Sequence, residues 1–115
     1  MAVGGYGNDT VNGAAGADTL EGGSGNDHFA FTDLTHSTTG AADVVWDFKA
    51  VGATETDKIV LTGLGITGIG AGATEFTITN TGIYKVITHN SSTFQINLLG
   101  YYAAGTDIIA ADFVF

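Results

Sequence analysis

Large apolar residues recur at every ninth position near the start of the chain. Val11, Leu20 and Phe29 are each the centre of a short segment flanked by polar or small residues. In a strand of three residues the middle side chain points away from its two neighbours. The spacing therefore predicts three short strands whose central residues face a core and whose preceding residues face outward. These outward residues are Thr10, Thr19 and His28.

Alternation of apolar and polar residues predicts further strands along the rest of the chain. The last of them, joined by turns at 80–82 and 89–92, predict an antiparallel meander, and the glycine-rich run 63–72 is expected to be an irregular loop. No segment has a convincing helical period, although 107–112 is compatible with one short turn of helix. The chain is therefore predicted to be all-β. The predicted strands are 44–48, 59–61, 76–78, 83–88 and 94–98.

The strand expected at 44–48 contains the single tryptophan. Val44, Trp46 and Phe48 alternate with Val45 and Asp47, which is typical of a half-buried strand. We therefore expect Trp46 to lie on the buried face and to join Phe29 and Phe31 in one core.

Around the first apolar centres the chain repeats a pattern rich in glycine and aspartate. Three nine-residue units, 4–12, 13–21 and 22–30, follow one another without a gap. Glycine fills positions one and four of every unit, aspartate fills position six, and a large apolar residue fills position eight. Glycine permits positive φ and close backbone packing, so six residues can turn sharply with inward carbonyls. This period is typical of a calcium-binding parallel β-roll.

These units resemble the repeats of the RTX (repeats-in-toxin) proteins, which Gram-negative bacteria export by the type I pathway. The segments 29–34, 43–48 and 57–61 resemble those that close the β-roll in serralysin-type metalloproteases and, equally, in the R-modules of mannuronan C5-epimerases. The resemblance implies a short, right-handed parallel β-roll with 18 residues per coil, continued into a capping antiparallel β-sheet. Residues 1–115 are thus interpreted as a single module, with the repeats in 4–30 and the capping region in 31–115.

The resemblance also implies where calcium binds. Two units make one coil, so repeats one and three stack while repeat two lies on the opposite side. Ca²⁺ takes six to eight oxygen ligands, and the resemblance implies that stacked loops supply them as carbonyls and as position-six carboxylates. Asp9 and Asp27 are expected to sandwich one ion in a complete site. The other candidate ligands of this site are Gly4, Tyr6, Asn8, Gly22, Ser24 and Asn26.

A second site is expected around Asp18, with Gly13 and Ala15 as the other candidate ligands. No matching loop stacks on it, since 31–39 breaks the pattern, so the site is half built unless a downstream residue caps it. Two aspartates, Asp33 and Asp43, are candidate donors for that cap.

The second repeat also departs from the pattern within its own loop. Ala14 replaces the second glycine, and Ala17 is apolar at position five. Alanine still offers its carbonyl, so we expect this site to survive the two changes.

Composition narrows the choice of partners. Twelve acidic residues against three basic ones give a formal charge of −9 at pH 7, which argues against nucleic acid or an anionic membrane. Cysteine is absent, so disulfides and thiolate metal sites are excluded. No apolar run approaches the roughly 18 residues of a spanning helix, so membrane insertion is not expected. Bound calcium is therefore the candidate for stiffening the fold. The chain is expected to be a monomer.

Enzymatic chemistry is not indicated by the motifs. The chain has neither a G-x-S-x-G elbow nor an H-E-x-x-H zinc helix. His28 is expected to face outward from a strand, His36 lies in a loop beside Ser37, and His89 sits at a turn. The carboxylates of the repeats are assigned to metal rather than to acid–base work. No catalytic residue is predicted.

The sequence thus predicts a non-catalytic, calcium-binding C-terminal module of a larger secreted protein. Met1-Ala2-Val3 leads straight into the first repeat, so a catalytic or repeat domain is expected upstream. The resemblance implies an extracellular location after type I export from a Gram-negative bacterium, with the export machinery as a partner. The ending 112–115 resembles part of a type I secretion signal, or is a last strand that closes a sheet. Folding is expected to be coupled to calcium, because clustered aspartates repel and the glycine-rich segment buries little apolar surface.

The alternative function is polysaccharide binding, as in epimerase R-modules that assist binding of anionic alginate. Charge speaks against it, because four acidic and no basic residues occur through Ala30, and only Lys49, Lys58 and Lys85 follow. Binding of a polyanion normally needs a basic strip, although calcium would offset part of the deficit.

Overall fold

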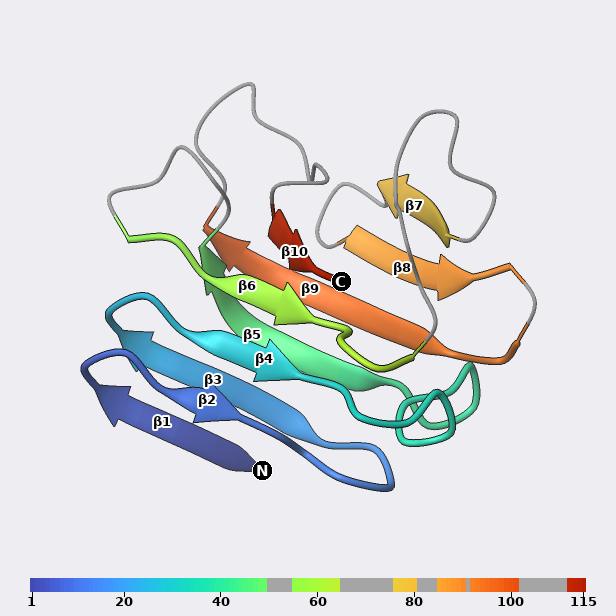
Figure 1. The fold of residues 1–115 in the computed structure, drawn as a ribbon, viewed down its shortest axis with the longest axis horizontal. Coiled ribbons are helices and arrows are strands. Elements are labelled where there is room, and N and C mark those ends of the chain that lie inside the picture. The colour runs from blue at the N-terminus through green and yellow to red at the C-terminus, as the bar shows by residue number, and fades with distance from the viewer. Residues whose placement is uncertain (50–54, 65–75, 81–84, 91, 102–111) are drawn as a thin grey trace.

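The computed structural model describes residues 1–49, 55–64, 76–80, 85–90, 92–101 and 112–115. Within them ten β-strands form two sheets, which Figure 1 shows as stacked layers. The first sheet has the strand order β1-β3-β5-β9-β8-β7, and the second has the order β10-β6-β4-β2. The strands are β1 (Ala2–Tyr6), β2 (Thr10–Val11), β3 (Thr19–Ser24), β4 (His28–Ala30), β5 (Asp43–Lys49), β6 (Lys58–Val60), β7 (Phe76–Asn80), β8 (Lys85–His89), β9 (Gln95–Tyr101) and β10 (Phe113–Val114).

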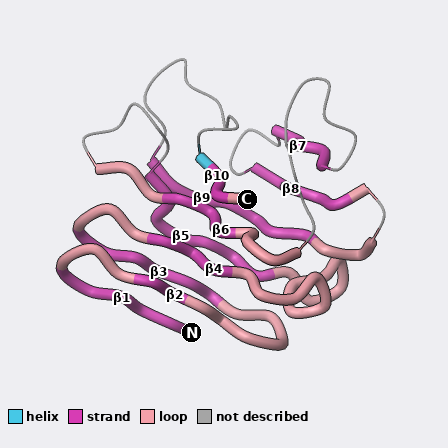
Figure 2. The backbone as a smooth tube through the Cα atoms, in the orientation of Figure 1, coloured by secondary structure: helices cyan, strands magenta, loops and turns pink. Residues whose placement is uncertain are grey.

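From β1 to β6 the chain alternates between the two sheets, so that it winds as a coil (Figure 2). The first two coils are in parallel register at an offset of one repeat pair. Ala2 pairs with Leu20 in the first sheet, and Thr10 pairs with His28 in the second. The expected parallel β-roll is therefore confirmed, with repeats one and three stacked on each other. β3 is longer than the three-residue strand expected, because its pairing with β1 continues through Gly23 and Ser24.

The parallel roll continues past the glycine-rich repeats. β5 lies parallel to β3, and β6 lies parallel to β4, with Thr19 paired to Val44 and His28 paired to Lys58. The chain returns to β5 and β6 after longer excursions than in the first coils, since the paired residues are no longer 18 apart. β9 and β10 then extend the two sheets in parallel with β5 and β6. β5 and β6 thus keep the parallel register of the first coils without containing glycine themselves.

An antiparallel part completes the first sheet. β8 pairs antiparallel with both β7 and β9, and the turn between β8 and β9 is closed by a hydrogen bond from His89 N to Phe94 O of 3.1 Å. The expected meander is thus confirmed in the described residues, where it extends the sheet beyond β9. The loop expected within 63–72 is described only up to Leu64. Residues 81–84, which include the expected turn at 80–82, and 107–111 lie outside the described residues.

The core lies between the two sheets, where the position-eight residues form columns. Val11, Phe29, Ile59 and Phe113 stack across the second sheet, and every one of them is buried. In the first sheet Leu20, Val45 and Leu98 stack in the same way. Thr10 and His28 are exposed and Thr19 is half-buried, so the predicted orientation of the first strands is confirmed.

Aromatic rings join the two halves of the core. The ring centroids of Phe29 and Phe48 lie 6.2 Å apart. Those of Phe31 and Phe94 lie 5.7 Å apart in an edge-to-face arrangement, which is a favoured geometry for aromatic pairs. The third repeat is therefore packed against β5, and Phe31, directly after it, is packed against the segment before β9.

The prediction that Trp46 belongs to this core is wrong. Its side chain is 57% exposed, whereas Val45 and Phe48 are both fully buried. The pairing of β5 with β9 shifts register between Val45 and Phe48, as at a β-bulge. A bulge changes which residues face the core, so strict alternation through 44–48 does not hold. Trp46 faces solvent and Asp47 is left free to contact the neighbouring loop.

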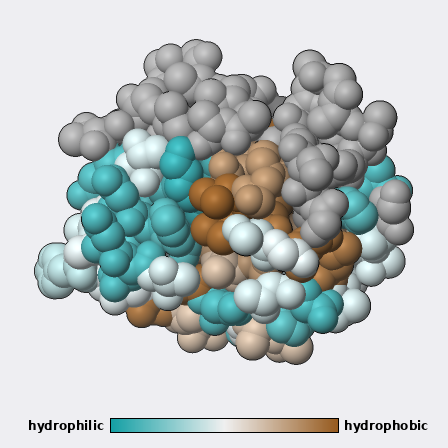
Figure 3. Space-filling model, viewed as in Figure 1, coloured by the Kyte–Doolittle hydropathy of each residue, from teal (hydrophilic) through white to brown (hydrophobic). Residues whose placement is uncertain are grey.

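Figure 3 shows how hydropathy is distributed on one face of the molecule. Apolar residues gather near the middle of this face, around the position of β10, and hydrophilic residues lie beside them. Val114 and Phe115 are each 37% exposed, and the Phe115 ring stacks on Phe113 at 6.0 Å. Among the described residues no helix is long and apolar enough to span a membrane.

The bulge in β5 yields a test with two aromatic residues from one strand. Phe48→Ala should lower the free energy of unfolding by about 3–5 kcal/mol, because it removes a fully buried ring. Trp46→Ala should change it by about 0.5 kcal/mol or less, as for an exposed position. Chemical denaturation in calcium would measure both values.

A loss for Trp46→Ala as large as that for Phe48→Ala would contradict the orientation of β5. Should Phe48→Ala fail to fold, Phe48→Leu serves in its place, with an expected loss near 1 kcal/mol.

Candidate metal site between stacked loops

The loops that lead from the first sheet to the second lie directly above one another, and we call this edge the Asp9 side. Asp9 N donates to Asp27 Oδ1 at 2.8 Å, and His28 N donates to Asp9 O at 2.8 Å. A matching contact joins Asn26 N to Asn8 Oδ1 at 2.8 Å. Backbone and side-chain groups of one loop thus fix the position of the next.

Glycine is needed where the two loops approach each other. Gly5, Gly7, Gly23 and Gly25 all have φ between 91° and 120°, a region that other residues rarely adopt. A side chain on Gly23 or Gly25 would collide with the carbonyl oxygens of Gly5 and Gly7. Carbonyls of the first loop are therefore directed toward the second loop.

The position-six carboxylate lies across the position-one glycine of its own repeat. A Cβ atom on Gly4 would lie 2.9 Å from Asp9 Oδ2, and one on Gly22 would lie 2.8 Å from the carboxyl carbon of Asp27. This contact explains why the repeat couples glycine at position one to aspartate at position six.

Among the described residues three carboxylate oxygens are buried without a hydrogen-bond partner, two at these loops and one in β5. They are Asp9 Oδ2, Asp27 Oδ2 and Asp43 Oδ2. The Asp27 side chain is fully buried. A buried anionic oxygen without a donor is unfavourable, and a hard cation with oxygen ligands would satisfy it. The donor set at Asp9 and Asp27, with carbonyls directed between the loops, therefore fits calcium.

The structure brings the predicted ligands of the Asp9 side together in two stacked loops. Tyr6 pairs with Ser24 and Gly5 pairs with Gly23 in the register of β1 and β3. The Tyr6 side chain is 93% exposed, so only its backbone is available to a site between the loops. Among the described residues no three Asp, Glu or His side chains gather as a metal cluster. The assignment of Gly4, Tyr6, Asn8, Gly22, Ser24 and Asn26 as ligands remains a prediction.

On the opposite edge, the Asp18 side, Asp43 fills the place of the missing repeat. Asp18 N donates to Asp43 Oδ1 at 2.9 Å, and Val44 N donates to Asp18 O at 2.9 Å. These are the same two contacts that join Asp9 to Asp27 and His28, although Asp43 follows Asp18 by 25 residues. Asp43 is therefore the residue that caps the Asp18 loop.

Asp33, the other candidate donor, does not contribute to this stack. Its Oδ1 accepts from Thr35 N at 2.8 Å and from Thr35 Oγ1 at 2.7 Å, and its side chain is exposed. These hydrogen bonds lower the pKa of Asp33. Asp33 stabilises its own turn instead.

The second repeat keeps its loop despite Ala14. Ala14 has a φ of 62°, which costs an L-residue energy that glycine avoids. Asn12 Oδ1 accepts from Ala14 N at 2.8 Å and supports this conformation. A Cβ atom on Gly13 would lie 3.1 Å from Asp18 Oδ2, as in the other repeats. The exposed Ala15 lies in the same loop, and its role as a ligand remains a prediction.

On the Asp18 side, the pKa of Asp43 differs from that of a solvated carboxylate. Burial raises the pKa of Asp43 from its usual 3.8 to about 6, and the nearby Asp18 charge adds to the rise. The hydrogen bond from Asp18 N and the charge of His36 act in the opposite direction. Asp43 N also donates to Ser37 Oγ at 2.7 Å, and Ser37 Oγ donates to Gln95 O. Asp43 is thus held in place while one of its oxygens lacks a partner.

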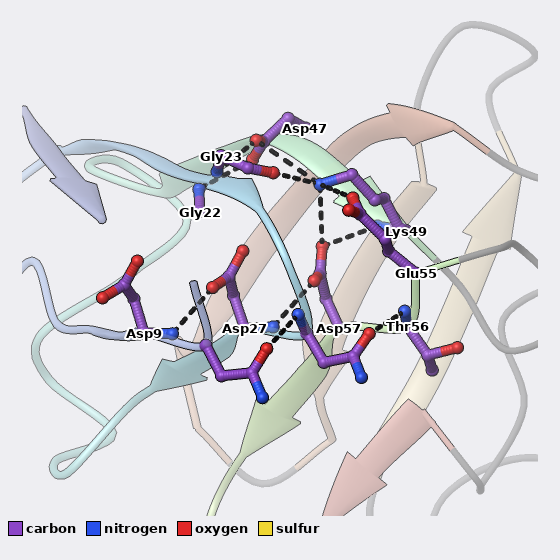
Figure 4. A network of polar contacts seen from close by, with 11 residues as sticks. Asp9, Gly22, Gly23, Asp27, Asp47, Lys49, Glu55, Thr56 and Asp57 are labelled. Atoms are coloured by element: carbon purple, nitrogen blue, oxygen red, sulfur yellow. Dashed lines mark hydrogen bonds and ion pairs between the residues drawn. The ribbon is translucent and has the colours of Figure 1, made fainter. Parts of the chain in front are cut away.

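Sequence reasoning missed a third loop on the Asp9 side. Asp27 N donates to Asp57 Oδ1 at 2.9 Å, so Asp9, Asp27 and Asp57 follow one another in a row (Figure 4). Burial raises the pKa of Asp57 as well, against hydrogen bonds from Asp27 N and Lys49 N. The signal was an aspartate two residues before a buried apolar residue, as in Asp57 to Ile59 and Asp43 to Val45. That part of the nonapeptide pattern persists although the glycines of positions two and four are missing from both segments.

Two comparisons with known proteins agree with this arrangement. Residues 2–30 match the model of the RTX calcium-binding nonapeptide repeat in 4 copies. The solution structure of the AlgE6R3 subunit from the Azotobacter vinelandii mannuronan C5-epimerase is similar, with a TM-score of 0.68 and 26% identity. That match covers 98% of this chain and 66% of the AlgE6R3 chain. No curated protein matches the sequence.

The fold and the repeats therefore lead to the same description. Residues 2–30 carry RTX calcium-binding repeats, and the all-strand fold around them is similar to that of the AlgE6R3 subunit.

Proposed function

We propose that this chain is a non-catalytic calcium-binding module that folds when calcium occupies the space between its stacked loops. One observation carries the proposal. Asp27 is fully buried, and its Oδ2 has no hydrogen-bond partner although Oδ1 is bonded to the loop below. A cation shared with Asp9 and the neighbouring carbonyls would complete its coordination. When bound, calcium would supply positive charge and bring the two loops together.

Without calcium the same arrangement opposes folding. The chain has a formal charge of −9, and the roll stacks carboxylates of like sign on both edges. Repulsion between such groups destabilises the compact state, and the glycine-rich loops add a large ordering entropy. Binding free energy then becomes folding free energy. Calcium affinities of extracellular modules, about 10⁻⁴ to 10⁻³ M, match such a switch.

This coupling supports a role in type I secretion and in stability outside the cell. Low calcium in the cytosol of a Gram-negative bacterium would leave the module unfolded and exportable, and higher calcium outside would fold it. In this proposal the chain is the C-terminal module of a larger secreted protein, and 31–115 caps the repeats. Phe113 of β10 pairs with Ile59 of β6 and is buried, so the C-terminal segment stabilises the second sheet besides any part in export.

A second candidate function, polysaccharide binding, rests on the outer face of the second sheet. A hollow in this face is lined by Asn8, Asp9, Thr10, Asn26 and His28. Amide and hydroxyl groups of this kind suit hydrogen bonding to sugars, and the similar AlgE6R3 subunit comes from a mannuronan C5-epimerase. The negative charge of the chain opposes a polyanion, so calcium would have to bridge or offset that charge.

Calcium coupling is tested by a conservative change at Asp27. Asp27→Asn keeps the shape and the oxygen that accepts from Asp9 N, and it removes the charge. The calcium concentration at half-folding should rise about tenfold or more, which corresponds to about 1.4 kcal/mol. A calcium titration followed by circular dichroism would measure this shift.

Asp33→Asn is the matched control, because it removes one negative charge from an exposed turn outside the stack. Its midpoint should stay within about twofold of the parent chain, as for surface charges that salt screens. Equal midpoints for the two variants, or equal β content with and without calcium in the parent chain, would refute the coupling.

The raised pKa of Asp43 predicts how the β content of the calcium-free chain responds to pH. Its pKa in the folded state, about 6, exceeds the usual 3.8, so the folded state favours the protonated acid. This contribution is fully present below pH 4 and is lost as pH rises through 6. In metal-free buffer the residual β content should therefore be higher at pH 5 than at pH 7.5.

Asp43→Asn mimics the protonated acid and should weaken that dependence. Circular dichroism of both chains, stripped of calcium, at a series of pH values would show it. The same slope in both chains would contradict the assignment to Asp43.

Polysaccharide binding is tested by titrating mannuronan oligomers into the calcium-loaded chain. Saturable changes in the amide shifts of Asn26 and His28, lost in Asn26→Ala, are expected if the hollow binds sugar. A titration without saturable change would exclude this second function.

A further inference from the structure

The third loop on the Asp9 side repeats the hydrogen bonds of the first two. Asp57 Oδ1 accepts from Asp27 N at 2.9 Å, as Asp27 Oδ1 accepts from Asp9 N at 2.8 Å. Lys58 N donates to Asp27 O at 2.8 Å, and Thr56 N donates to Asn26 Oδ1 at 2.8 Å. Asp57 therefore occupies position six of a third coil, 30 residues after Asp27.

The Oδ2 atom of Asp57 has partners within the chain, unlike the Oδ2 atoms of Asp9 and Asp27. Those two lack a partner at Oδ2. Asp57 Oδ2 accepts from Lys49 N at 2.9 Å and lies 4.0 Å from Lys49 Nζ. A positive group of the chain itself thus lies beside the carboxylate that completes the row.

Lys49 Nζ is surrounded by oxygen atoms from several segments (Figure 4). It lies 3.9 Å from Asp47 Oδ2 and 3.6 Å from Glu55 Oε2, and it donates to Gly23 O. The Lys49 side chain is only 19% exposed. A glycine carbonyl of the second loop and carboxylates of the third are the donors that a hard cation would take.

In the sequence ahead of Asp57, glycine is kept at position one as Gly52, whereas Ala53 and Glu55 stand where the first two loops have glycines of positive φ. Asp47 binds the second loop instead, since its Oδ1 accepts from Gly22 N at 2.9 Å and its Oδ2 accepts from Gly23 N at 2.7 Å. Carboxylate and ammonium side chains of β5 thus contact the second loop in place of a third glycine-rich loop.

We propose that Lys49 is a tethered cation that takes the place of a calcium ion between the second and third loops of the Asp9 side. It ends the metal sites on this edge, so calcium is confined to the space between the first two loops, and the third coil is held without metal. The inference rests on the proposed function for the first site. It adds that a lysine side chain, and not calcium, occupies the cation position between the second and third loops.

Replacing the lysine should turn this position into a calcium site. Lys49→Met keeps the length and the apolar stem of the side chain and removes the charge, leaving Asp47, Glu55, Asp57 and Gly23 O without a cation. Isothermal titration with CaCl₂ should count one more ion per chain than in the parent. Lys58→Met, which removes the same charge from β6, and Lys49→Arg, which keeps the cation, should both bind the parental number.

The two hypotheses fail in different ways. A parent chain that binds no calcium would refute the proposed function, whereas the count for Lys49→Met minus that of the parent tests the lysine alone. A folded Lys49→Met chain with the parental count would overturn the inference.

A double variant keeps the test decisive if Lys49→Met does not fold. Lys49→Met with Glu55→Gln removes one of the carboxylates that lose their cation, so it should recover more β content than Lys49→Met alone at the calcium concentration that folds the parent chain. Circular dichroism would measure the rescue. No gain from the second substitution would show that Lys49 does not balance these carboxylates, and the inference would fall.

Discussion

The hydrogen bond between a position-six carboxylate and the backbone of the neighbouring coil is the interaction on which this structure depends. It recurs from Asp9 to Asp27, from Asp27 to Asp57, and from Asp18 to Asp43. Each such bond sets the register of one coil on the next. It also places carboxylates of like charge in a row, so the interaction that builds the roll creates a need for positive charge within it.

The two edges of the roll meet that need in different ways. Between Asp9 and Asp27 the chain supplies glycine carbonyls and unpartnered carboxylate oxygens, which suits a calcium ion from solution. Beside Asp57 it supplies Lys49 instead. On the Asp18 side, burial raises the pKa of Asp43, against a hydrogen bond from Asp18 N and the charge of His36. The carboxylates of the roll thus stand in three different settings, one open to a cation, one beside a lysine and one buried with a raised pKa.

The spacing between coils is less strict than the repeats suggest. One coil takes 18 residues where both loops are glycine-rich, yet Asp43 follows Asp18 by 25 residues and Asp57 follows Asp27 by 30. Extra residues are accommodated in the connections, where added length has a small entropic cost. Strand register is preserved because the apolar columns of Leu20, Val45 and Leu98 must remain aligned in the core.

The features that are local and periodic can be predicted from the sequence. The nonapeptide period gave the parallel roll and the stacking of Asp9 with Asp27, and it gave the burial of Val11, Leu20 and Phe29, because glycine turns and alternating strands depend on neighbouring residues. Alternation also identified the strands around Ile59 and Ile96.

Contacts between groups far apart in the sequence depend on the folded chain as a whole. Asp43, and not Asp33, caps the Asp18 loop, and Asp57 extends the row of Asp9 and Asp27. Trp46 faces solvent because the register of β5 shifts at a bulge. These outcomes depend on how long connections return the chain to the sheet, and no period in the sequence records that return. The position of Lys49 among oxygens of three segments has the same cause, since its partners are brought together by coil packing rather than by spacing along the chain.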